Sequence, residues 1–220
     1  MIPPPELVIF DCDGVLVDSE LIACQSVAMC LNDADLHMPL DEVIQSYMGV
    51  STQTMMDDLT QRFGRCLPVN FADVLQRRTR EAFDSNLKAM DGAAQILQSI
   101  QFRICVASSS SPERILHSLE ITGLLEFFNG NIFSATQVGR GKPAPDLFLF
   151  TARQMSVPAK DCVVVEDSIP GVQAGCAAGM RVLGFTGGSH CRPGHGYSLR
   201  EAGAMETFNT MLRLPTLLGS

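Results

Sequence analysis

The chain lacks long apolar runs, and it has few charged residues for its length. No apolar run approaches the roughly 20 residues that a membrane span needs. The opening MIPPPELVIF has neither the basic segment nor the apolar stretch of a signal peptide. Charged residues make up 18% and hydrophobic residues 46% of the 220 positions, which disfavours disorder and allows a sizeable core. We expect a soluble, cytoplasmic protein with one large domain, or with a core and a smaller insert.

Paired cysteine motifs are also absent, because none of the eight cysteines forms a Cys-x-x-Cys pair. Cys105 in FRICVA and Cys162 before VVV lie in apolar runs, which predicts buried thiols that pack as small hydrophobic side chains. Scattered free thiols are typical of a reducing compartment.

Basic residues are fewer than acidic ones, and the formal net charge is −8. An acidic surface of that size repels nucleic acid and anionic lipid, and we predict neither as a partner. An anionic substrate would need local positive charge or a metal ion at its site. Nothing in the sequence specifies an oligomeric state.

Short apolar runs recur along the chain, rich in β-branched or aromatic residues and without alternation. Such runs are typical of strands buried on both faces of a parallel sheet. They cover residues 7–10, 104–107, 163–165 and 182–185. Helical candidates lie between them, at residues 93–100, 112–119 and 145–155. The alternation predicts an α/β fold with a parallel sheet.

Residues 18–86 break that alternation, because they contain no strand-like run. Apolar residues there follow helical spacing, as in the segment 40–48. We predict a small all-helical insert at 18–86, between the first strand and the rest of the sheet. Residues 1–17 and 87–220 would then form the core.

The first predicted strand runs directly into the motif DCDG. Residues two apart in an extended strand point to the same side. Asp11 and Asp13 can therefore share a site beyond the carboxyl end of the strand, where open α/β sheets bind ligands. Two neighbouring carboxylates suit a nucleophile paired with a proton donor and acceptor. Acidic residues and glycine also form ordinary turns, so this motif alone leaves a plain turn open.

The run VASSSSPE places Ser108 at the exit of the second predicted strand. Its hydroxyl and the N–H groups of the turn can hold a phosphate oxygen. For the next serines we favour helix capping. Ser110 can form a capping box with Glu113, or Ser111 can cap a helix that starts at Pro112.

Two further motifs, GRGKPAPD and VVVEDS, carry charge. Lys142 lies between glycine and proline and can neutralise phosphate and carboxylate together, although most surface lysines are idle. Glu166 and Asp167 follow a buried strand directly. Favourable charge at a helix N-terminus explains their sign but not their place at a strand exit.

If these strand ends converge, several carboxylates share one cavity, and such a cavity requires a cation. Hard oxygen ligands select Mg²⁺, which also binds phosphate. The ion would shield an anionic nucleophile from an anionic phosphate, and phosphoryl transfer needs mainly positioning and charge neutralisation. The sequence therefore predicts magnesium-dependent phosphoryl transfer.

The ordered motifs DCDGVLVDSE, VASSS, GKPAPD and VVVEDS resemble the four motifs of the haloacid dehalogenase superfamily. The similarity spans nearly the whole chain. It is greatest to the group that contains phosphoglycolate phosphatase, β-phosphoglucomutase and small sugar-phosphate phosphatases. It implies a Rossmann-like core with helices on both faces of a parallel sheet, and a helical cap inserted just after the first motif.

The resemblance also implies roles for single residues. Asp11 would be the nucleophile that becomes an aspartyl phosphate, while Asp13 would protonate the leaving oxygen and then activate water. The transferring phosphate would be bound by Ser108, Ser109 and Lys142.

A metal site is implied in the same way. Mg²⁺ would be held by Asp11, by the backbone carbonyl of Asp13 and by Asp167. Glu166 would either bind the ion or contact its ligands, and the sequence does not decide between the two.

The resemblance separates reactions as well. Asp13 favours phosphate chemistry, because dehalogenases need no acid two residues after the nucleophile. Mutases of the β-phosphoglucomutase type carry a cap histidine and a cap arginine, where this chain has Ala23 and Thr52. We expect a phosphatase acting on a sugar or sugar-acid phosphate. A sugar-phosphate mutase is the alternative, with Arg62 or Arg80 binding the second phosphate. A non-catalytic binding module is disfavoured because every chemical position is filled.

The cap loop of Gly49, Val50, Ser51 and Thr52 is the best candidate for substrate selection. A plain turn between two helices explains this loop equally well. The tail loop GGSHCRPGHG contains His190, Cys191 and His195, whose spacing fits no common zinc site, so we expect no zinc there. We expect His37 and His117 to be surface residues.

Overall fold

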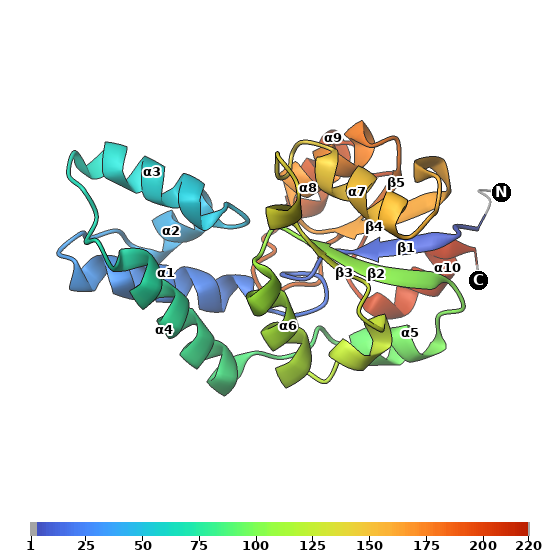
Figure 1. Ribbon diagram of the computed structural model, residues 1–220, viewed down its shortest axis with the longest axis horizontal. Coiled ribbons are helices and arrows are strands. Elements are labelled where there is room, and N and C mark those ends of the chain that lie inside the picture. Colours follow the sequence, from blue (N-terminus) through green and yellow to red (C-terminus); the bar gives the residue numbers. More distant parts are fainter. Residues whose placement is uncertain (1–3, 220) are drawn as a thin grey trace. The chain divides into compact units, whose positions relative to one another are not determined.

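A parallel six-stranded sheet organises the larger part of the chain in the computed structural model, which describes residues 4–219 (Figure 1). The strand order is β3-β2-β1-β4-β5-β6, and all neighbouring strands are parallel. The strands are β1 (Leu7–Phe10), β2 (Arg103–Ser108), β3 (Ile132–Ser134), β4 (Cys162–Glu166), β5 (Arg181–Phe185) and β6 (Glu206–Phe208). The helices of this part are α5 (Ala93–Ser99), α6 (Pro112–Ile121), α7 (Asp146–Gln154), α8 (Ile169–Ala177), α9 (His195–Glu201) and α10 (Leu214–Leu218).

Helices cover both faces of this sheet (Figure 1). On one face, Leu7, Ile9 and Val164 of the strands share a buried cluster with Leu147 of α7 and Val172 of α8. Helices α5, α6 and α10 lie on the other face. All residues of β1 and β4 are buried, which is why these strands appear in the sequence as continuous apolar runs. The predicted α/β class is confirmed.

The site is positioned by the topology of the two central strands. From β1 the chain continues to β2 and β3 on one side of the sheet, and it then returns to β4 on the other side of β1. The boundary between β1 and β4 is therefore a topological switch point, where open α/β sheets bind ligands beyond the carboxyl ends of the strands. Asp11, Ser108 and Asp167 follow or end β1, β2 and β4 at that edge.

The remaining helices form a second compact unit, Ser19–Leu87, while Met1–Asp18 and Lys88–Ser220 form the first. Its helices are α1 (Glu20–Asp33), α2 (Leu40–Tyr47), α3 (Thr52–Phe63) and α4 (Phe71–Asn86), and the unit contains no strand. The predicted all-helical insert after the first strand is confirmed. Its own buried cluster includes Leu31, Val43, Leu59 and Leu75, one from each helix. Across residues 4–219, no helix has the length and apolar character that crossing a membrane requires.

Candidate active site

The first motif forms a tight turn that begins where β1 ends. Asp11 N donates to the Val165 carbonyl at 3.0 Å, which fixes the backbone of Asp11 beside the end of β4. The turn then closes with a hydrogen bond from Gly14 N to the Val17 carbonyl at 2.8 Å. Gly14 has a φ of 76°, and a Cβ there would lie 1.9 Å from Asp167 Oδ2. Only glycine allows both the left-handed backbone and this close approach.

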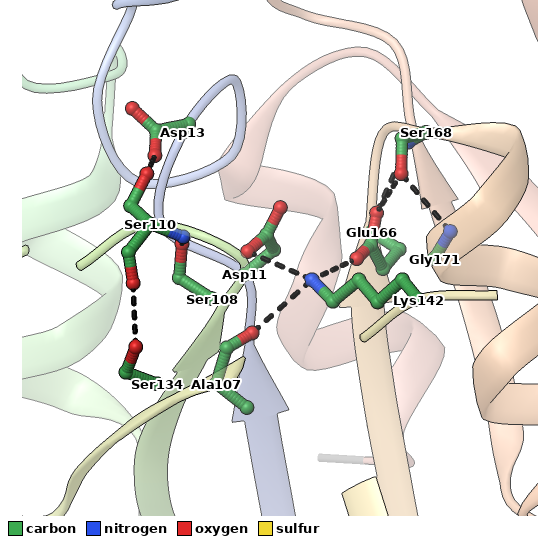
Figure 2. A network of polar contacts seen from close by, with 10 residues as sticks. All are labelled: Asp11, Asp13, Ala107, Ser108, Ser110, Ser134, Lys142, Glu166, Ser168 and Gly171. Atoms are coloured by element: carbon green, nitrogen blue, oxygen red, sulfur yellow. Dashed lines mark hydrogen bonds and ion pairs between the residues drawn. The ribbon is translucent and has the colours of Figure 1, made fainter. Parts of the chain in front are cut away.

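Three buried carboxylates meet at the switch point. Oxygen atoms of Asp11, Glu166 and Asp167 lie within 4.8 Å of one another, and these residues are 7%, 0% and 4% exposed. Lys142 lies between Asp11 and Glu166 and comes from the loop before α7 (Figure 2). Its Nζ lies 3.0 Å from Asp11 Oδ1 and 2.5 Å from Glu166 Oε1, and it donates to the Ala107 carbonyl at 3.2 Å.

The charges of this cluster do not balance within it. Burial raises the pKa of Asp11 well above its usual range; the Lys142 ammonium opposes the shift, while Glu166 and Asp167 add to it. Burial disfavours the charged form of Lys142, but Asp11 and Glu166 outweigh that effect and raise its pKa. Three carboxylates facing one ammonium fit a divalent cation, and their hard oxygen donors fit Mg²⁺.

Glu166 contacts protein groups through both of its oxygens (Figure 2). Oε1 faces Lys142, and Oε2 accepts hydrogen bonds from the backbone N and the Oγ of Ser168 at 3.1 and 2.9 Å. Ser168 is the N-cap of α8, because its Oγ also accepts from Gly171 N at 3.0 Å. A Cβ at Gly171 would lie 1.9 Å from Glu166 Cδ, so α8 needs glycine at that position.

Asp13 is held by the elements that follow β2. Ser110 Oγ donates to Asp13 Oδ2 at 2.6 Å, and Arg114 Nη2 of α6 lies 2.9 Å from Asp13 Oδ1. The Ser110 carbonyl in turn accepts from Ser134 Oγ at 2.7 Å (Figure 2). The capping role favoured for Ser110 is therefore wrong. Ser111 caps α6, as the alternative predicted, because its Oγ accepts from Arg114 N.

The predicted phosphate-binding serines differ in exposure. Ser108 ends β2 and is 1% exposed, and its Oγ accepts from Ser110 N at 3.1 Å. Ser109 is exposed to solvent. Ser108 is therefore buried in the turn after β2, while Ser109 lies at the surface. Phosphate binding by either residue stays a prediction.

A second group of potential ligands lies beside the carboxylates. His190, Cys191 and His195 each offer a ligand atom, and these atoms lie within 4.8 Å of one another. His190 Nε2 is 2.9 Å from Asp167 Oδ2 and 3.3 Å from Cys191 Sγ. The expectation that His117 is a surface residue is wrong, because it is 8% exposed, and His190 is buried as well, at 3% exposed.

The same contacts explain the ionisation of these groups. Burial lowers the pKa of His190, but hydrogen bonds with Asp167 and Cys191 outweigh it and raise the value to about 10. Burial would raise the pKa of the Cys191 thiol, but contacts with His190 and His195 lower it. The tail loop thus gathers a basic imidazole and an acidic thiol next to Asp167.

The predicted substrate-selecting loop belongs to the helical unit. Gly49 has a φ of 71°, and its N donates to Glu20 Oε2 at 3.2 Å. Ser51 is the N-cap of α3, which begins at Thr52. The loop therefore includes the helix–helix turn that was the alternative interpretation. Arg62 forms an ion pair with Glu42 inside the same unit.

The comparisons with known proteins decide the family. A family model described as haloacid dehalogenase-like hydrolase matches residues 8–185. The chain belongs to this family. The predicted resemblance is confirmed, and the site lies at the strand ends that carry its motifs.

Individual members of the family resemble this hydrolase over most of its length. The 6-phosphogluconate phosphatase of Escherichia coli is 33% identical over 189 residues, which are 86% of each chain. The phosphorylated carbohydrates phosphatase of Thermotoga maritima is 29% identical over 211 residues, covering 91% of this chain and 92% of that protein.

Solved structures agree with the same family. A haloacid dehalogenase-like protein of unknown function from Agrobacterium tumefaciens has a TM-score of 0.85 and 36% identity, covering 97% of each chain. A family hydrolase from Deinococcus radiodurans, crystallised with bound phosphate and sodium, has a TM-score of 0.80 and 33% identity, covering 98% of this chain and 96% of that chain.

Proposed function

We propose that this hydrolase is a magnesium-dependent phosphatase of a small phosphorylated sugar or sugar acid, with Asp11 as its nucleophile. The observation that carries the proposal is the placement of a buried Asp11 among two further carboxylates and one buried lysine at the switch point of the sheet. Phosphoryl transfer requires mainly positioning and charge neutralisation, and this arrangement supplies groups for both.

The first step would transfer the phosphoryl group to the enzyme. An oxygen of Asp11 forms a bond to phosphorus while the bond from phosphorus to the ester oxygen breaks. Asp13, in its protonated form, gives its proton to the departing oxygen, so the product leaves as an alcohol. In the second step Asp13 takes a proton from water, the water oxygen attacks phosphorus, and the bond to Asp11 breaks to release inorganic phosphate.

The remaining groups would hold charge in place. Lys142 is oriented by Glu166 on one side and by Asp11 on the other, so its ammonium faces the carboxylate of the proposed nucleophile. We propose that Asp11 and Asp167, with the backbone carbonyl of Asp13, hold Mg²⁺, and that Glu166 acts through Lys142. When bound, the ion supplies positive charge between the anionic phosphate and the anionic nucleophile.

The substrate class follows from two kinds of support. The relatives named 6-phosphogluconate phosphatase and phosphorylated carbohydrates phosphatase act on sugar-type phosphates by name. The helical unit Ser19–Leu87 is a separate compact unit inserted after the first motif, and we propose that it is the cap, with the loop Gly49–Thr52 selecting the substrate.

The test is phosphate release from a panel of sugar and sugar-acid phosphates, each with Mg²⁺ and with EDTA. We expect Mg²⁺-dependent release from one or a few compounds, and none from the Asp11→Asn variant. Conversion of a sugar monophosphate into a positional isomer without phosphate release would instead identify a mutase. Full turnover in EDTA would contradict the metal assignment.

A further inference from the structure

A cluster of nitrogen and sulfur donors adjoins the carboxylate site and has no part in the proposed hydrolysis. It is formed by His190 and Cys191 of the loop between β5 and α9, and by His195, the first residue of α9. His190 is buried, while Cys191 and His195 are partly exposed, so a small ion can reach the cluster from solvent. All eight cysteines of the chain are free thiols, so the Cys191 Sγ is available as a ligand.

The tautomer of His195 suits metal coordination. His195 Nε2 lies 2.6 Å from the Asp167 carbonyl, which can only accept, so Nε2 carries the proton and Nδ1 keeps its lone pair. Backbone carbonyls commonly fix the tautomer of metal-binding histidines in this way. His190 Nε2 faces both Cys191 Sγ, at 3.3 Å, and Asp167 Oδ2, at 2.9 Å. A cation can replace the proton shared by these three atoms.

Two glycines pack closely against the His190 ring and fix its position. A Cβ at Gly188 would lie 2.5 Å from His190 Cε1, and one at Gly14 would lie 2.9 Å from the same atom. The preceding residue, Ser189, is fixed as well, because its N and Oγ both donate to Asp18 Oδ1, at 3.0 and 2.8 Å. The donors are thus held in place without an ion.

The donor set differs in kind from the carboxylate cluster. Mg²⁺ prefers oxygen ligands in octahedral geometry, whereas imidazole and thiolate ligands select Zn²⁺. Tetrahedral zinc with bonds of about 2.0–2.3 Å places its donor atoms roughly 3.3–3.6 Å apart. Cys191 Sγ and Asp167 Oδ2 lie 3.3 and 2.9 Å from His190 Nε2, so these donors need to move apart by only a few tenths of an ångström to surround an ion. The Asp167 carboxylate is close enough to complete four ligands.

We propose that His190, Cys191 and His195 bind one Zn²⁺ ion, with the Asp167 carboxylate as the fourth ligand. The expectation from the sequence, that these residues bind no zinc, was drawn from their spacing alone. That spacing does not reveal Asp167, which precedes the loop by an entire helix and strand.

Zinc binding has a consequence for catalysis, which rests on the proposed function. Asp167 belongs to both clusters, since its oxygens lie near Asp11 and Glu166 and its Oδ2 contacts His190. An ion bound by the histidines and Cys191 engages this carboxylate and competes with Mg²⁺ for it. Zn²⁺ is therefore an inhibitor that acts from beside the magnesium site.

Cobalt spectroscopy tests the binding site without any assay of activity. Co²⁺ is added to the metal-free wild-type protein, and the near-ultraviolet charge-transfer band of a thiolate–cobalt bond is recorded. We expect the band to saturate at one equivalent and to disappear when one equivalent of Zn²⁺ is added. The band should be lost in Cys191→Ser and retained in Cys176→Ser, a control that removes an exposed thiol outside the cluster.

Circular dichroism of Cys191→Ser establishes that the variant is folded. A wild-type protein without the band at stoichiometric Co²⁺ overturns the proposal, as does a band that survives Cys191→Ser. His195→Gln is the second variant. Loss of a residue that only contacts a metal ligand weakens metal binding by roughly 10-fold or more, so loss of His195, a proposed ligand, should weaken Zn²⁺ binding by at least that factor. Unchanged Zn²⁺ affinity in both variants also overturns it.

Inhibition tests the shared carboxylate. With Mg²⁺ present, we expect Zn²⁺ to inhibit the wild type and Cys176→Ser at the same concentration, and Cys191→Ser only at a concentration about 10-fold higher or more. Equal inhibition of the wild type and Cys191→Ser would contradict a ligand shared between the two clusters. Failure of the phosphatase assay itself would leave the cobalt result intact, so the two proposals are tested separately.

Discussion

At the scale of single residues, the buried carboxyl group of Asp11 is costly to ionise. The pKa of its carboxyl is raised by burial and by neighbouring carboxylates, so an ionised Asp11 is disfavoured in the metal-free protein. We predict that Asp11→Asn abolishes phosphate release and raises the melting temperature of the metal-free protein at neutral pH. Parallel activity assays and thermal melts check both effects, with Asp41→Asn on the exposed face of α2 as the control. A less stable Asp11→Asn would contradict the electrostatic argument.

Asp13 is the proposed general acid and base, and its carboxylate is held by contacts with Ser110 and Arg114. We predict that Asp13→Asn lowers kcat by about 10²- to 10⁴-fold for an alkyl phosphate, as expected for loss of a general acid and base. An aryl phosphate, whose leaving group needs no proton, should still phosphorylate Asp11 and give a burst of product. Rapid-quench kinetics on both substrates checks this. Wild-type steady-state turnover in Asp13→Asn would refute the acid–base role.

Arg114 is a site residue that could not be predicted, because its partner lies far away in the sequence. Asp11, Asp13, Lys142, Glu166 and Asp167 stand out because charge follows an apolar strand or interrupts a glycine–proline loop. Arg114 does not stand out, because it contacts Asp13 from 101 positions further along the chain. Such pairs depend on strand order, which a single sequence does not specify.

At the scale of elements, the close approach of α8 to β4 holds the lysine–carboxylate pair. A Cβ at Gly171 would overlap the Glu166 carboxyl group, whereas the atoms nearest to a Cβ at Gly175, one turn later, belong to Val182 and Val164 of the core. We predict that Gly171→Ala displaces Glu166 and with it Lys142, lowering kcat as well as stability. Gly175→Ala should cost about 1–3 kcal/mol of stability, typical of overpacking, without changing kcat.

Denaturant unfolding and steady-state kinetics on the two variants separate these effects. Equal kcat values for the folded fractions of Gly171→Ala and Gly175→Ala would show that Glu166 does not position the catalytic lysine.

The strands with both faces covered by helices could be predicted from the sequence, whereas the strands at the two edges of the sheet could not. Strands β1, β2, β4 and β5 appear as apolar runs because helices cover them on both sides. The edge strands β3 and β6 have three residues each and pair on one side only, so their sequences carry little signal. Helix α9 is not predicted, and its first two residues fall within the predicted tail loop, whose glycine- and proline-rich composition is typical of a loop.

At the scale of the whole molecule, Mg²⁺ and protons compete for the same carboxylates. Because the pKa of Asp11 is raised on folding, the folded state keeps a proton that the unfolded state has already lost above the usual carboxyl pKa. Over that range the stability contributed by this group falls as the pH rises. Magnesium binding requires the ionised form and releases the proton, so its stabilising effect should grow with pH.

We predict that the same Mg²⁺ concentration raises the melting temperature more at about pH 8 than at about pH 5.5, because protons compete less at the higher pH. At a free Mg²⁺ concentration 100 times the Kd, the free energy of unfolding increases by about 2.7 kcal/mol. Differential scanning calorimetry with Mg²⁺ and with EDTA measures it, and Asp167→Asn should abolish the gain. A gain in melting temperature that is larger at the lower pH would contradict the proposed ligands.

The central claim is that Asp11 carries the phosphoryl group, and trapping the phosphoenzyme tests it most directly. The enzyme is mixed with Mg²⁺ and a substrate found in the panel, quenched in acid within one turnover, digested and analysed by mass spectrometry. The account predicts one added phosphoryl group on the peptide that contains Asp11, removed by hydroxylamine and missing in Asp11→Asn. Phosphate release at the wild-type rate from an enzyme whose Asp11 peptide is never modified, or from Asp11→Asn itself, would contradict it.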